Sequence, residues 1–574
     1  MSRDEREFHP RLSGPSDTRA KPLSLMGEVR RAAAKAGFLA KGPAGGGTGR
    51  RGRGARAGLP ARSDRDARRV VIKARIVRHK GARFRAAPMG RHLSYLRREG
   101  VDQDGRTPAM FDAAGDGCDT KAFAERCAGD RHHFRFIVSP EDAAEMADLR
   151  TFTRELMAEV ASDLDTGLDW VAIDHWNTDN PHIHILMRGV ADDGTDLVID
   201  RSYISEEMRS RAQKRVTLEL GPRSELDIAA ALDREVDAEH WTSLDRRILS
   251  ITEETAGLLD LRRQAGSGTY ERRLIGRAMK LEKLGLAEPF APGCWSIGTD
   301  LEPTLRELGL RGDVIKTMHR TLTHAGRSAS PADFALHEDQ RPDRVTGRLV
   351  GRGLADELSG TAFAIVEGLD GRTHYLRFSD LEWTGDAAPG AIVELRQWKG
   401  RDGKDRSSLA VCSDLSLGEQ IHARGATWLD RRLVENGSPG QGAFGAEVRA
   451  AMTARADHLV AEDLAWRDDG RLLLSPRLLA HLRDRELTEA GAAIAARSGL
   501  AHQSIEQGEM VSGIYRERIT LASGRFAMID DGLGFQLVPW RPALDAHLGD
   551  RVVGTMRAGG AIDWTLHRTR GLSL

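Results

Sequence analysis

The chain has 574 residues, of which 40% are hydrophobic and 30% are charged, a composition typical of folded proteins with several domains. The net charge is zero, but residues 1–100 contain 26 Lys and Arg against 8 Asp and Glu. A basic block on an acidic remainder indicates a polyanionic partner such as nucleic acid or a membrane surface, unless the block is only a solvated leader. Because no run of about 18 apolar residues occurs, we expect no membrane span.

The N-terminal 230 residues divide into a leader and one predicted domain. Residues 1–66 are rich in Arg and Gly, which bury too little surface to offset chain entropy, so we predict a disordered basic leader. Residues 67–230 alternate between strand and helix patterns, which predicts an α+β domain with an antiparallel sheet and helices on one face. The predicted strands are residues 70–79, 133–140, 170–176 and 181–190, and the predicted helices are residues 86–100, 141–164 and 205–221. Ser139 and Pro140 are the expected cap and first turn of the second helix.

The remaining residues alternate between helical and β patterns. We predict a helical domain over residues 235–335, a small β-barrel over 340–415, a helical domain over 416–508 and a small β domain over 509–574. The helix pattern of residues 272–286 and the short strand at 293–298 resemble a winged helix. The order of helices followed by strands occurs twice, but no sequence repeat with a fixed period is evident.

Three histidines stand within ten residues at His175, His182 and His184. Side chains two positions apart on a strand share one face, so His182 and His184 are predicted to point the same way. A hairpin would bring His175 beside them. Three imidazole ligands leave coordination positions open, as in catalytic metal sites, and a cation there can neutralise charge on a phosphodiester. Packed or exposed histidines are the alternative.

Tyr95 is the only tyrosine before residue 200 and lies in a segment with Arg91, Arg97 and Arg98. A phenol attacks only when its phenolate is stabilised, which cationic neighbours and a metal achieve. The same arginines are expected to bind the DNA backbone. Tyr203 is the rival nucleophile, and a tyrosine that simply packs under the sheet is the alternative to both.

Four segments of the chain resemble the relaxase family of mobilization nucleases, which belong to the HUH endonucleases. The resemblance is greatest to the MobP-like branch, which carries a long C-terminal domain of unknown function. The matching segments are HLSYLRREGVDQDG (92–105), GDRHHFRFIVSPEDA (129–143), HWNTDNPHIHILMRG (175–189) and SYISEEMRSRAQKRVTLELGPRSELD (202–227). The first resembles the family's tyrosine motif and the third its three-histidine motif.

The resemblance implies a mechanism and a biological role. Tyr95 would attack the phosphodiester at the nick site of a plasmid or integrative-element transfer origin, leaving a 5′-phosphotyrosyl adduct and a free 3′-hydroxyl. His175, His182 and His184 would hold a divalent ion. The implied partners are single-stranded origin DNA, relaxosome accessory proteins and a type IV secretion coupling protein. The implied location is the bacterial cytoplasm, with transfer to a recipient cell together with the DNA.

The chain departs from the family at two positions near the histidines. Asn177 and Asn180 stand where many relatives have Asp and His. The group that orients a histidine or accepts the tyrosyl proton is therefore open, with Asp174 and Asp179 as candidates, because metal-bound histidines usually have such an acceptor.

More than one metal and more than one role are compatible with the sequence. Imidazole ligands favour Zn, Co, Ni or Mn, whereas the resemblance implies Mg or Mn. A rolling-circle replication initiator or an HUH transposase would use the same chemistry, and a catalytically silent DNA-binding protein would use none of it. No GxxxxGK[ST] loop occurs, so no ATPase is implied.

Overall fold

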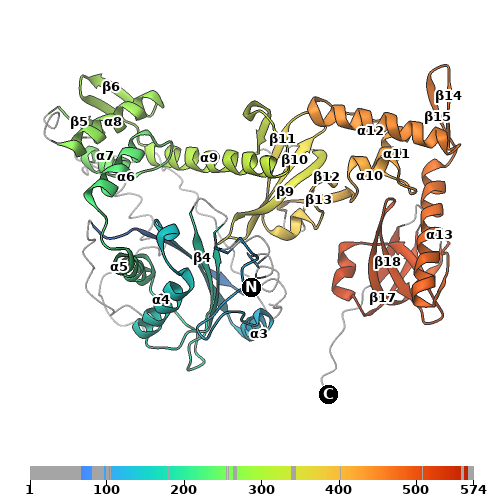
Figure 1. The fold of residues 1–574 in the computed structure, drawn as a ribbon, viewed down its shortest axis with the longest axis horizontal. Helices are drawn as coiled ribbons and strands as arrows, with labels where there is room; N and C mark the ends of the chain where they lie inside the picture. Colours follow the sequence, from blue (N-terminus) through green and yellow to red (C-terminus); the bar gives the residue numbers. More distant parts are fainter. Residues whose placement is uncertain are drawn as a thin grey trace, which may run out of the picture.

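The computed structural model of the chain describes residues 66–79, 93, 96–97, 102–103, 105–176, 180–253, 255, 257–262, 268–337, 344–400, 403–506, 508–557 and 561–565. Helices and strands are mixed throughout these residues, which confirms the predicted α+β class (Figure 1). None of the helices in the described part combines the length and apolar composition that crossing a membrane requires. The predicted leader, residues 1–66, lies outside the described residues apart from Asp66.

The N-terminal unit is built on one antiparallel sheet with the strand order β1-β2-β4-β3. Its strands are β1 (Val70–Arg78), β2 (His132–Pro140), β3 (Trp170–His175) and β4 (His182–Arg188). Its helices are α3 (Thr120–Arg126), α4 (Leu149–Leu164) and α5 (Met208–Leu220), with short helical turns at η1 (Cys127–Gly129), η2 (Ala143–Glu145) and η3 (Tyr203–Glu207). We call this sheet the N-terminal sheet.

Helical segments cover both faces of the N-terminal sheet, so the prediction of helices on one face was wrong. On the first face, residues such as Phe136 and Ile185 pack with α4 and α5, and we call this the core face. On the other face, Val171 and Leu186 pack with α3 and with the helical residues Leu93 and Leu96. The reason is that β3 and β4 carry apolar side chains on both sides, and each apolar side must be covered.

The first long helix starts later than the sequence predicted. Ser139 and Pro140 end strand β2 rather than capping a helix. Helix α4 begins at Leu149, and the carboxylate of Asp148 accepts a hydrogen bond from the backbone N–H of Arg150. Asp is as good an N-cap as Ser, and the preceding residues make only one short helical turn, so Asp148 sets the start.

The C-terminal part consists of two copies of one arrangement, residues 225–413 and 416–565, which we call the first and second repeats. Each copy has three helices, a β-hairpin, a long helix and a six-stranded sheet, in that order, and the first copy has an additional short strand between its second and third helices that pairs with its hairpin. The first repeat contains α6 (Glu225–Asp237), α7 (Ser243–Thr252), β5 (Leu258–Asp260), α8 (Thr269–Lys283), β6 (Ala287–Ala291), β7 (Cys294–Ile297) and α9 (Leu301–His324), then η4 (Pro331–Asp333), β8 (Phe334–Leu336), β9 (Thr346–Asp356), β10 (Thr361–Gly368), β11 (Thr373–Phe378), η5 (Leu381–Thr384), β12 (Ile392–Lys399) and β13 (Asp405–Ser413). The second contains α10 (Leu417–Ile421), α11 (Trp428–Val434), α12 (Gly442–Ala461), β14 (Ala465–Asp468), β15 (Arg471–Leu474) and α13 (Leu478–Ser498), then β16 (Ala501–His502), β17 (Met510–Leu521), β18 (Gly524–Asp530), β19 (Gly534–Pro539), η6 (Pro542–His547), β20 (Arg551–Met556) and β21 (Ile562–Thr565).

The two six-stranded sheets have the same topology. The first has the order β8-β11-β10-β9-β12-β13 and the second has the order β16-β19-β18-β17-β20-β21. Strands at the same place in the two sheets therefore have equivalent neighbours. In both, only the first pair is parallel and the others are antiparallel. Neither sheet closes on itself within the described residues, so the prediction of a small β-barrel over residues 340–415 was wrong. Closure requires the two edge strands to pair, and the sequence pattern of short strands does not encode that pairing.

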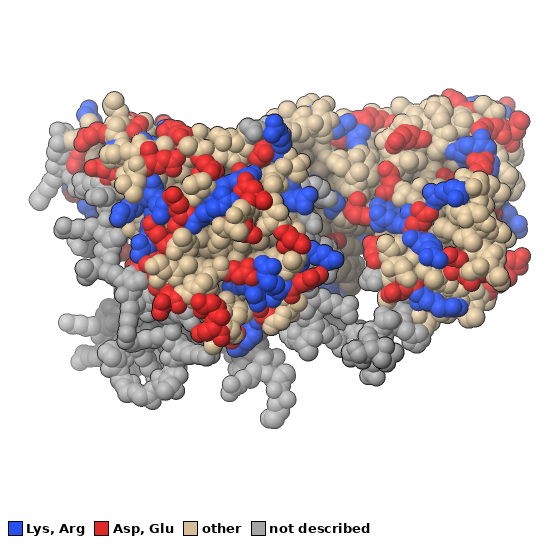
Figure 2. All heavy atoms as spheres, turned by 60° about the horizontal axis from the view of Figure 1, so that its bottom comes forward, with Lys and Arg blue, Asp and Glu red and all other residues tan. Residues whose placement is uncertain are grey.

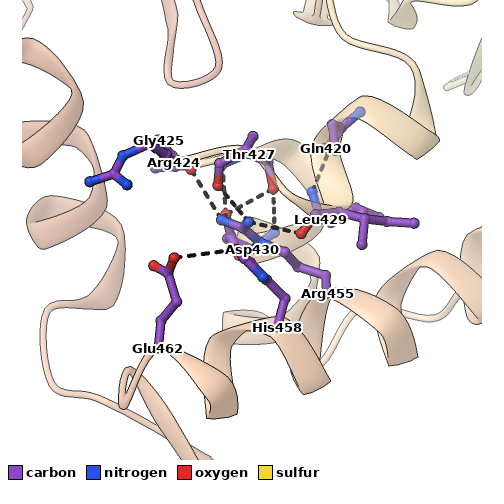
Figure 3. Close-up of polar contacts among 12 residues, drawn as sticks. Gln420, Arg424, Gly425, Thr427, Leu429, Asp430, Arg455, His458 and Glu462 are labelled. Atoms are coloured by element: carbon purple, nitrogen blue, oxygen red, sulfur yellow. Dashed lines mark hydrogen bonds and ion pairs between the residues drawn. The ribbon is translucent and has the colours of Figure 1, made fainter. Parts of the chain in front are cut away.

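A buried arginine holds the helices together in the same way in both repeats. Arg277 of α8 binds Asp245 with neither side chain exposed, and Arg455 of α12 does the same with Asp430 (Figure 3). Each guanidinium also donates to three backbone carbonyls, two, four and six positions before a capping threonine. These carbonyls belong to Val236, Ala238 and His240 in the first repeat and to Ile421, Ala423 and Gly425 in the second.

The sequence retains only short traces of this duplication. The motif Thr-x-Leu-Asp-Arg-Arg opens α7 at Thr242 and α11 at Thr427, and each threonine forms a capping box with the aspartate three positions later. The aspartate and arginine are 32 residues apart in the first repeat and 25 in the second. Because the linking segments differ in length, no fixed period is visible in the sequence.

The repeats lie beside the N-terminal unit and follow one another along the molecule. Figure 1 shows α9 running from the helices of the first repeat to its sheet, and α13 running down to the sheet of the second. Arg525 of β18 forms an ion pair with Asp386 of the first repeat, which joins the two repeats, and a second one with Asp414 in the link between them. On the face shown in Figure 2, Lys and Arg side chains are interspersed with Asp and Glu.

Candidate metal centre

The hairpin of β3 and β4 places three histidines on one face of the N-terminal sheet. His175 is directly opposite His182, and Ile173 is opposite His184. Cross-strand partners share a face and residues two apart on a strand share a face, so the three imidazoles lie together. We call this side the histidine face. Ile183 and Ile185 lie on the core face, as the alternation predicted.

The ring nitrogens of these histidines form a compact cluster with a carboxylate from the first repeat. The Nε2 atoms of His182 and His184 are 3.0 Å apart. Glu357 Oε2 lies 3.0 Å from His184 Nε2 and 3.4 Å from His182 Nε2. One ligand atom from each of His175, His182, His184 and Glu357 lies within 4.8 Å of every other, so the group could hold a metal ion.

Glu357 is the member of this group that sequence reasoning missed. It stands in the turn between β9 and β10, far along the chain from the histidines. The turn has an ordinary sequence, Asp-Glu-Leu-Ser-Gly, without a metal-binding pattern. Only the docking of the first repeat on the N-terminal sheet brings this carboxylate to the imidazoles, and no local signal predicts such docking.

The environment of the cluster sets the charge of each group. Burial, together with repulsion from His184, lowers the pKa of His175 to about 3, so its ring is neutral at pH 7. Burial alone would lower the pKa of His182, but the hydrogen bond and charge of Glu357 outweigh burial and raise it. Burial opposes ionisation of Glu357, yet attraction to His184 and His182 holds the pKa of Glu357 well below its usual range. A neutral imidazole and an ionised carboxylate are the forms that bind cations.

Backbone carbonyls orient two of the three rings. His175 Nε2 lies 2.9 Å from the carbonyl oxygen of Leu96, and His182 Nδ1 lies 2.9 Å from that of Asn180. A carbonyl oxygen only accepts, so each of these nitrogens carries the proton in that contact. In the neutral form of each ring, the other nitrogen holds the lone pair that a cation needs.

The segment that carries the predicted nucleophile meets the cluster through its described residues. Tyr95 lies outside the residues that the structure describes. Leu93 and Leu96, on either side of it in the sequence, are buried against Val171, Ile173 and Leu186 on the histidine face. The carbonyl of Leu96 is the group that contacts His175.

Asp174 does not orient the histidines. It points to the core face, where Oδ1 accepts from Arg150 Nε at 3.0 Å and Oδ2 from Trp176 Nε1 at 2.8 Å. Successive strand residues point to opposite faces, so a neighbour of His175 cannot share its face. Asp179, the other candidate, lies outside the described residues.

The rival nucleophile, Tyr203, lies on the wrong side of the sheet. Its ring is fully buried among the residues of the core face, and its hydroxyl donates to Asp163 at 2.8 Å. Burial and the hydrogen bond to Asp163 raise the pKa of Tyr203 far above its ordinary value. A buried neutral phenol on the opposite face from the imidazoles cannot attack a phosphate held by them.

Basic side chains other than the predicted ones lie beside the cluster. Arg97 is exposed, while Arg91 and Arg98 lie outside the described residues. On the histidine face, Arg75 is directly opposite Arg135, and Lys73 is opposite Ile137, whose other partner is His184. The alternation of β1 and β2 was visible in the sequence, but the pairing that aligns these residues was not.

The chain therefore belongs to a class of α+β proteins with an N-terminal sheet that bears a three-histidine, one-carboxylate centre and with a duplicated helix-and-sheet region behind it. Residues 274–407 and 399–573 match the family described as "Protein of unknown function (DUF3363)", and the chain belongs to that family. No curated protein and no solved structure matches the chain.

Proposed function

We propose that the N-terminal unit is a metal-dependent nuclease that nicks and rejoins single-stranded DNA through Tyr95. The observation that carries the proposal is the convergence of His175, His182 and His184 on one face at the ends of β3 and β4. The donor set fits a divalent ion, because three imidazole nitrogens leave positions for oxygen ligands. The contact of the Leu96 carbonyl with His175 brings the chain next to residue 95 up to this site, which supports Tyr95 as the nucleophile.

The chemistry of the proposed reaction is a transesterification. The Tyr95 oxygen forms a bond to phosphorus, the bond to the 3′ oxygen breaks, and that oxygen leaves with a proton as a 3′-hydroxyl. The phenol proton passes to solvent or to a base. A divalent ion on the three histidines would neutralise charge on the phosphodiester. No nucleotide is consumed, since the tyrosyl ester conserves the phosphodiester energy.

The finer parts of the proposal come from the resemblance to relaxases. We propose a transfer origin as the DNA target, Mg or Mn as the working ion, and relaxosome proteins and a secretion coupling protein as partners. The acidic balance of the repeats favours protein partners over extensive DNA wrapping for this part of the chain.

The test uses the purified full chain, single-stranded origin DNA and Mn²⁺ or Mg²⁺. Nicking should give a DNA adduct that denaturing gels resolve, and a chelator should abolish it. Tyr95→Phe should remove the adduct, whereas the control Tyr270→Phe, at a partly exposed tyrosine of α8, should keep it. An adduct that persists in Tyr95→Phe would exclude this nucleophile, and DNA binding without metal-dependent cleavage would identify a silent binder.

A further inference from the structure

The turn between β9 and β10 of the first repeat rests on the histidine face of the N-terminal sheet. We call residues 357–360 the tip. Its Glu357 carboxylate contacts His182 and His184. The carbonyl of Leu358 lies 3.5 Å from the NH1 atom of Arg135, and Gly360 faces the same guanidinium. The tip thus presents one anionic oxygen and one carbonyl oxygen to two separate cationic positions.

The equivalent hairpin of the second repeat is shorter and stays within its own copy. In the first repeat, Gly347 of β9 lies against the backbone carbonyl of Glu367 in β10. In the second repeat, Gly513 of β17 lies against the carbonyl of Asp530 in β18 in the same way, so the two pairs are equivalent positions. These residues are 20 positions apart in the first repeat and 17 in the second. Two of the three extra residues lie in the turn, which has four residues (357–360) in the first repeat and two (522–523) in the second, and the third comes from an additional bulge in the β9–β10 pairing.

A carboxylate of α13 holds the second hairpin in place, and α9 has a glycine at the matching position of the first repeat. Glu486 of α13 accepts hydrogen bonds from the backbone N–H groups of Ala522 and Ser523 at the turn between β17 and β18. The position of Glu486 in α13 corresponds to Gly309 in α9, counted from the buried leucines that start both helices. With no side chain at Gly309, the first hairpin has no such anchor on its own helix.

The histidine face is arranged to bind anions beside the cluster. Arg75 and Arg135 are directly opposite each other on β1 and β2, a like-charge pairing that is unfavourable unless an anion lies between or beside them. Arg135 donates to His133 Nε2 and to Leu358, and it forms no ion pair with a described carboxylate, although the charge of Asp380 acts on it. His133 is in turn bonded to His79, and His79 to the carbonyl of Asp130, so the orientation of Arg135 is fixed by a hydrogen-bonded chain.

We propose that Arg135 and the histidine cluster bind successive phosphates of single-stranded DNA, and that the tip of the first repeat occupies both positions until the DNA displaces it. This inference rests on the proposed nuclease function and adds to it a phosphate-binding residue and an internal competitor. Glu357 takes the place of one phosphate oxygen and the Leu358 carbonyl that of another. Carboxylate and phosphate oxygens are equivalent hard ligands for a divalent ion and for imidazolium.

The contacts of the tip are suited to displacement. The carbonyl contact to Arg135 is at the outer limit of a hydrogen bond, and a charged phosphate would bind the guanidinium in a bidentate manner. The Glu357 side chain remains 30% exposed, so solvent and an incoming strand reach it from one side.

The test measures binding of a fluorescein-labelled oligothymidylate to the full chain by anisotropy, with a chelator present and then with Mn²⁺. Glu357→Gln should raise the affinity three- to tenfold in both conditions, because the variant tip competes less well. Glu517→Gln, which makes the same charge change on the sheet of the second repeat, should leave it unchanged. Arg135→Gln should lower the affinity at least threefold and should remove most of the gain when combined with Glu357→Gln.

Two results would overturn the proposal. One is unchanged or weaker DNA binding by Glu357→Gln, together with weaker Mn²⁺ binding, which would make Glu357 a permanent ligand rather than a competitor. The other is unaltered DNA binding by Arg135→Gln while its thermal unfolding matches that of the wild type. If DNA binding responds as expected but no adduct forms, the nuclease proposal fails and the competition stands. If the adduct forms but DNA binding does not change in the variants, the competition proposal fails and the nuclease proposal stands.

Discussion

The guanidinium of Arg455 is bound to the carboxylate of Asp430 with both side chains closed off from solvent. Arg277 and Asp245 repeat this pair in the other copy. Removing one member of a buried ion pair leaves an uncompensated charge and typically costs about 3–5 kcal/mol. The same arginine also satisfies three backbone carbonyls that no other described group binds in its place, so we expect it to control the local stability of each repeat.

Arg455→Met should therefore loosen α11 and α12 while the first repeat remains folded, and Arg277→Met should do the opposite. Amide hydrogen exchange, followed by mass spectrometry, reports each helix separately, which matters because a chain with several units does not unfold in two states. Arg306→Met is the control, since its pair with Glu302 is exposed and contributes little. Equal protection of α11 and α12 in wild type and Arg455→Met would contradict the expectation.

The close approach of backbones at Gly347 and Gly513 should make both positions intolerant of a methyl group. A Cβ atom at either glycine would overlap the carbonyl group of Glu367 or Asp530 across the hairpin. Overpacking against rigid backbone costs about 1–3 kcal/mol, so both alanine variants should unfold at lower urea concentration. Gly312→Ala, in α9 with open space around it, should be neutral or stabilising by up to about 1 kcal/mol.

The low pKa of His175 predicts how the stability of the N-terminal unit depends on pH. The folded pKa is about 3 and the ordinary value is 6.5, so between these values the unfolded chain binds a proton that the folded chain does not. Stability from this residue is complete above pH 6.5 and falls as the pH decreases toward 3. Between pH 7 and 5 the loss should approach about 2 kcal/mol.

His175→Gln lacks this titration and provides the comparison. Without added metal, the free energy of unfolding of the wild type should exceed that of the variant by less and less as the pH falls. His182 titrates in both proteins and so cancels to a first approximation. An advantage that grows on acidification would show that His175 is not held neutral.

Metal affinity should depend on the histidines of the cluster. His184→Ala should weaken binding of Zn²⁺ or Mn²⁺, measured by calorimetry at pH 7.5, by about tenfold or more, because loss of a direct ligand exceeds the usual effect of an outer partner. His319→Ala, at an exposed histidine of α9, is the control. Equal affinity of the two variants would place the metal elsewhere or exclude it.

The sequence predicted the part of the site that depends on local geometry. The alternation of β4 was sufficient to place His182 and His184 on one face, and the short loop was sufficient to bring His175 opposite His182. It could not reveal Glu357, because this residue reaches the cluster only through contacts between two separately folded sheets. Asp174 was misjudged for a simple reason: its position next to His175 in the sequence puts it on the other face.

The sequence was less informative about the C-terminal fold. The order of helices and strands was legible, but barrel closure depends on which edges pair, and the edges β8, β13, β16 and β21 remain apart within the described residues. The duplication was hidden because packing conserves a few contacts, such as Arg277 with Asp245, while the linking segments change length freely. Loop length costs little free energy, so selection on it is weak.

The continuity of α9 has a mechanical consequence. This helix has 24 residues and spans about 36 Å, from Leu301 in the helical part of the first repeat to His324 beside its sheet. Met318 and Leu322 are fixed to the sheet through Val350 and Ile365. The helix therefore acts as a rigid lever, and a turn of about 5° at its N-terminal end would move the far end by about 3 Å. A displacement of the helical part of the first repeat would in this way be passed on to the sheet whose β9–β10 turn carries Glu357.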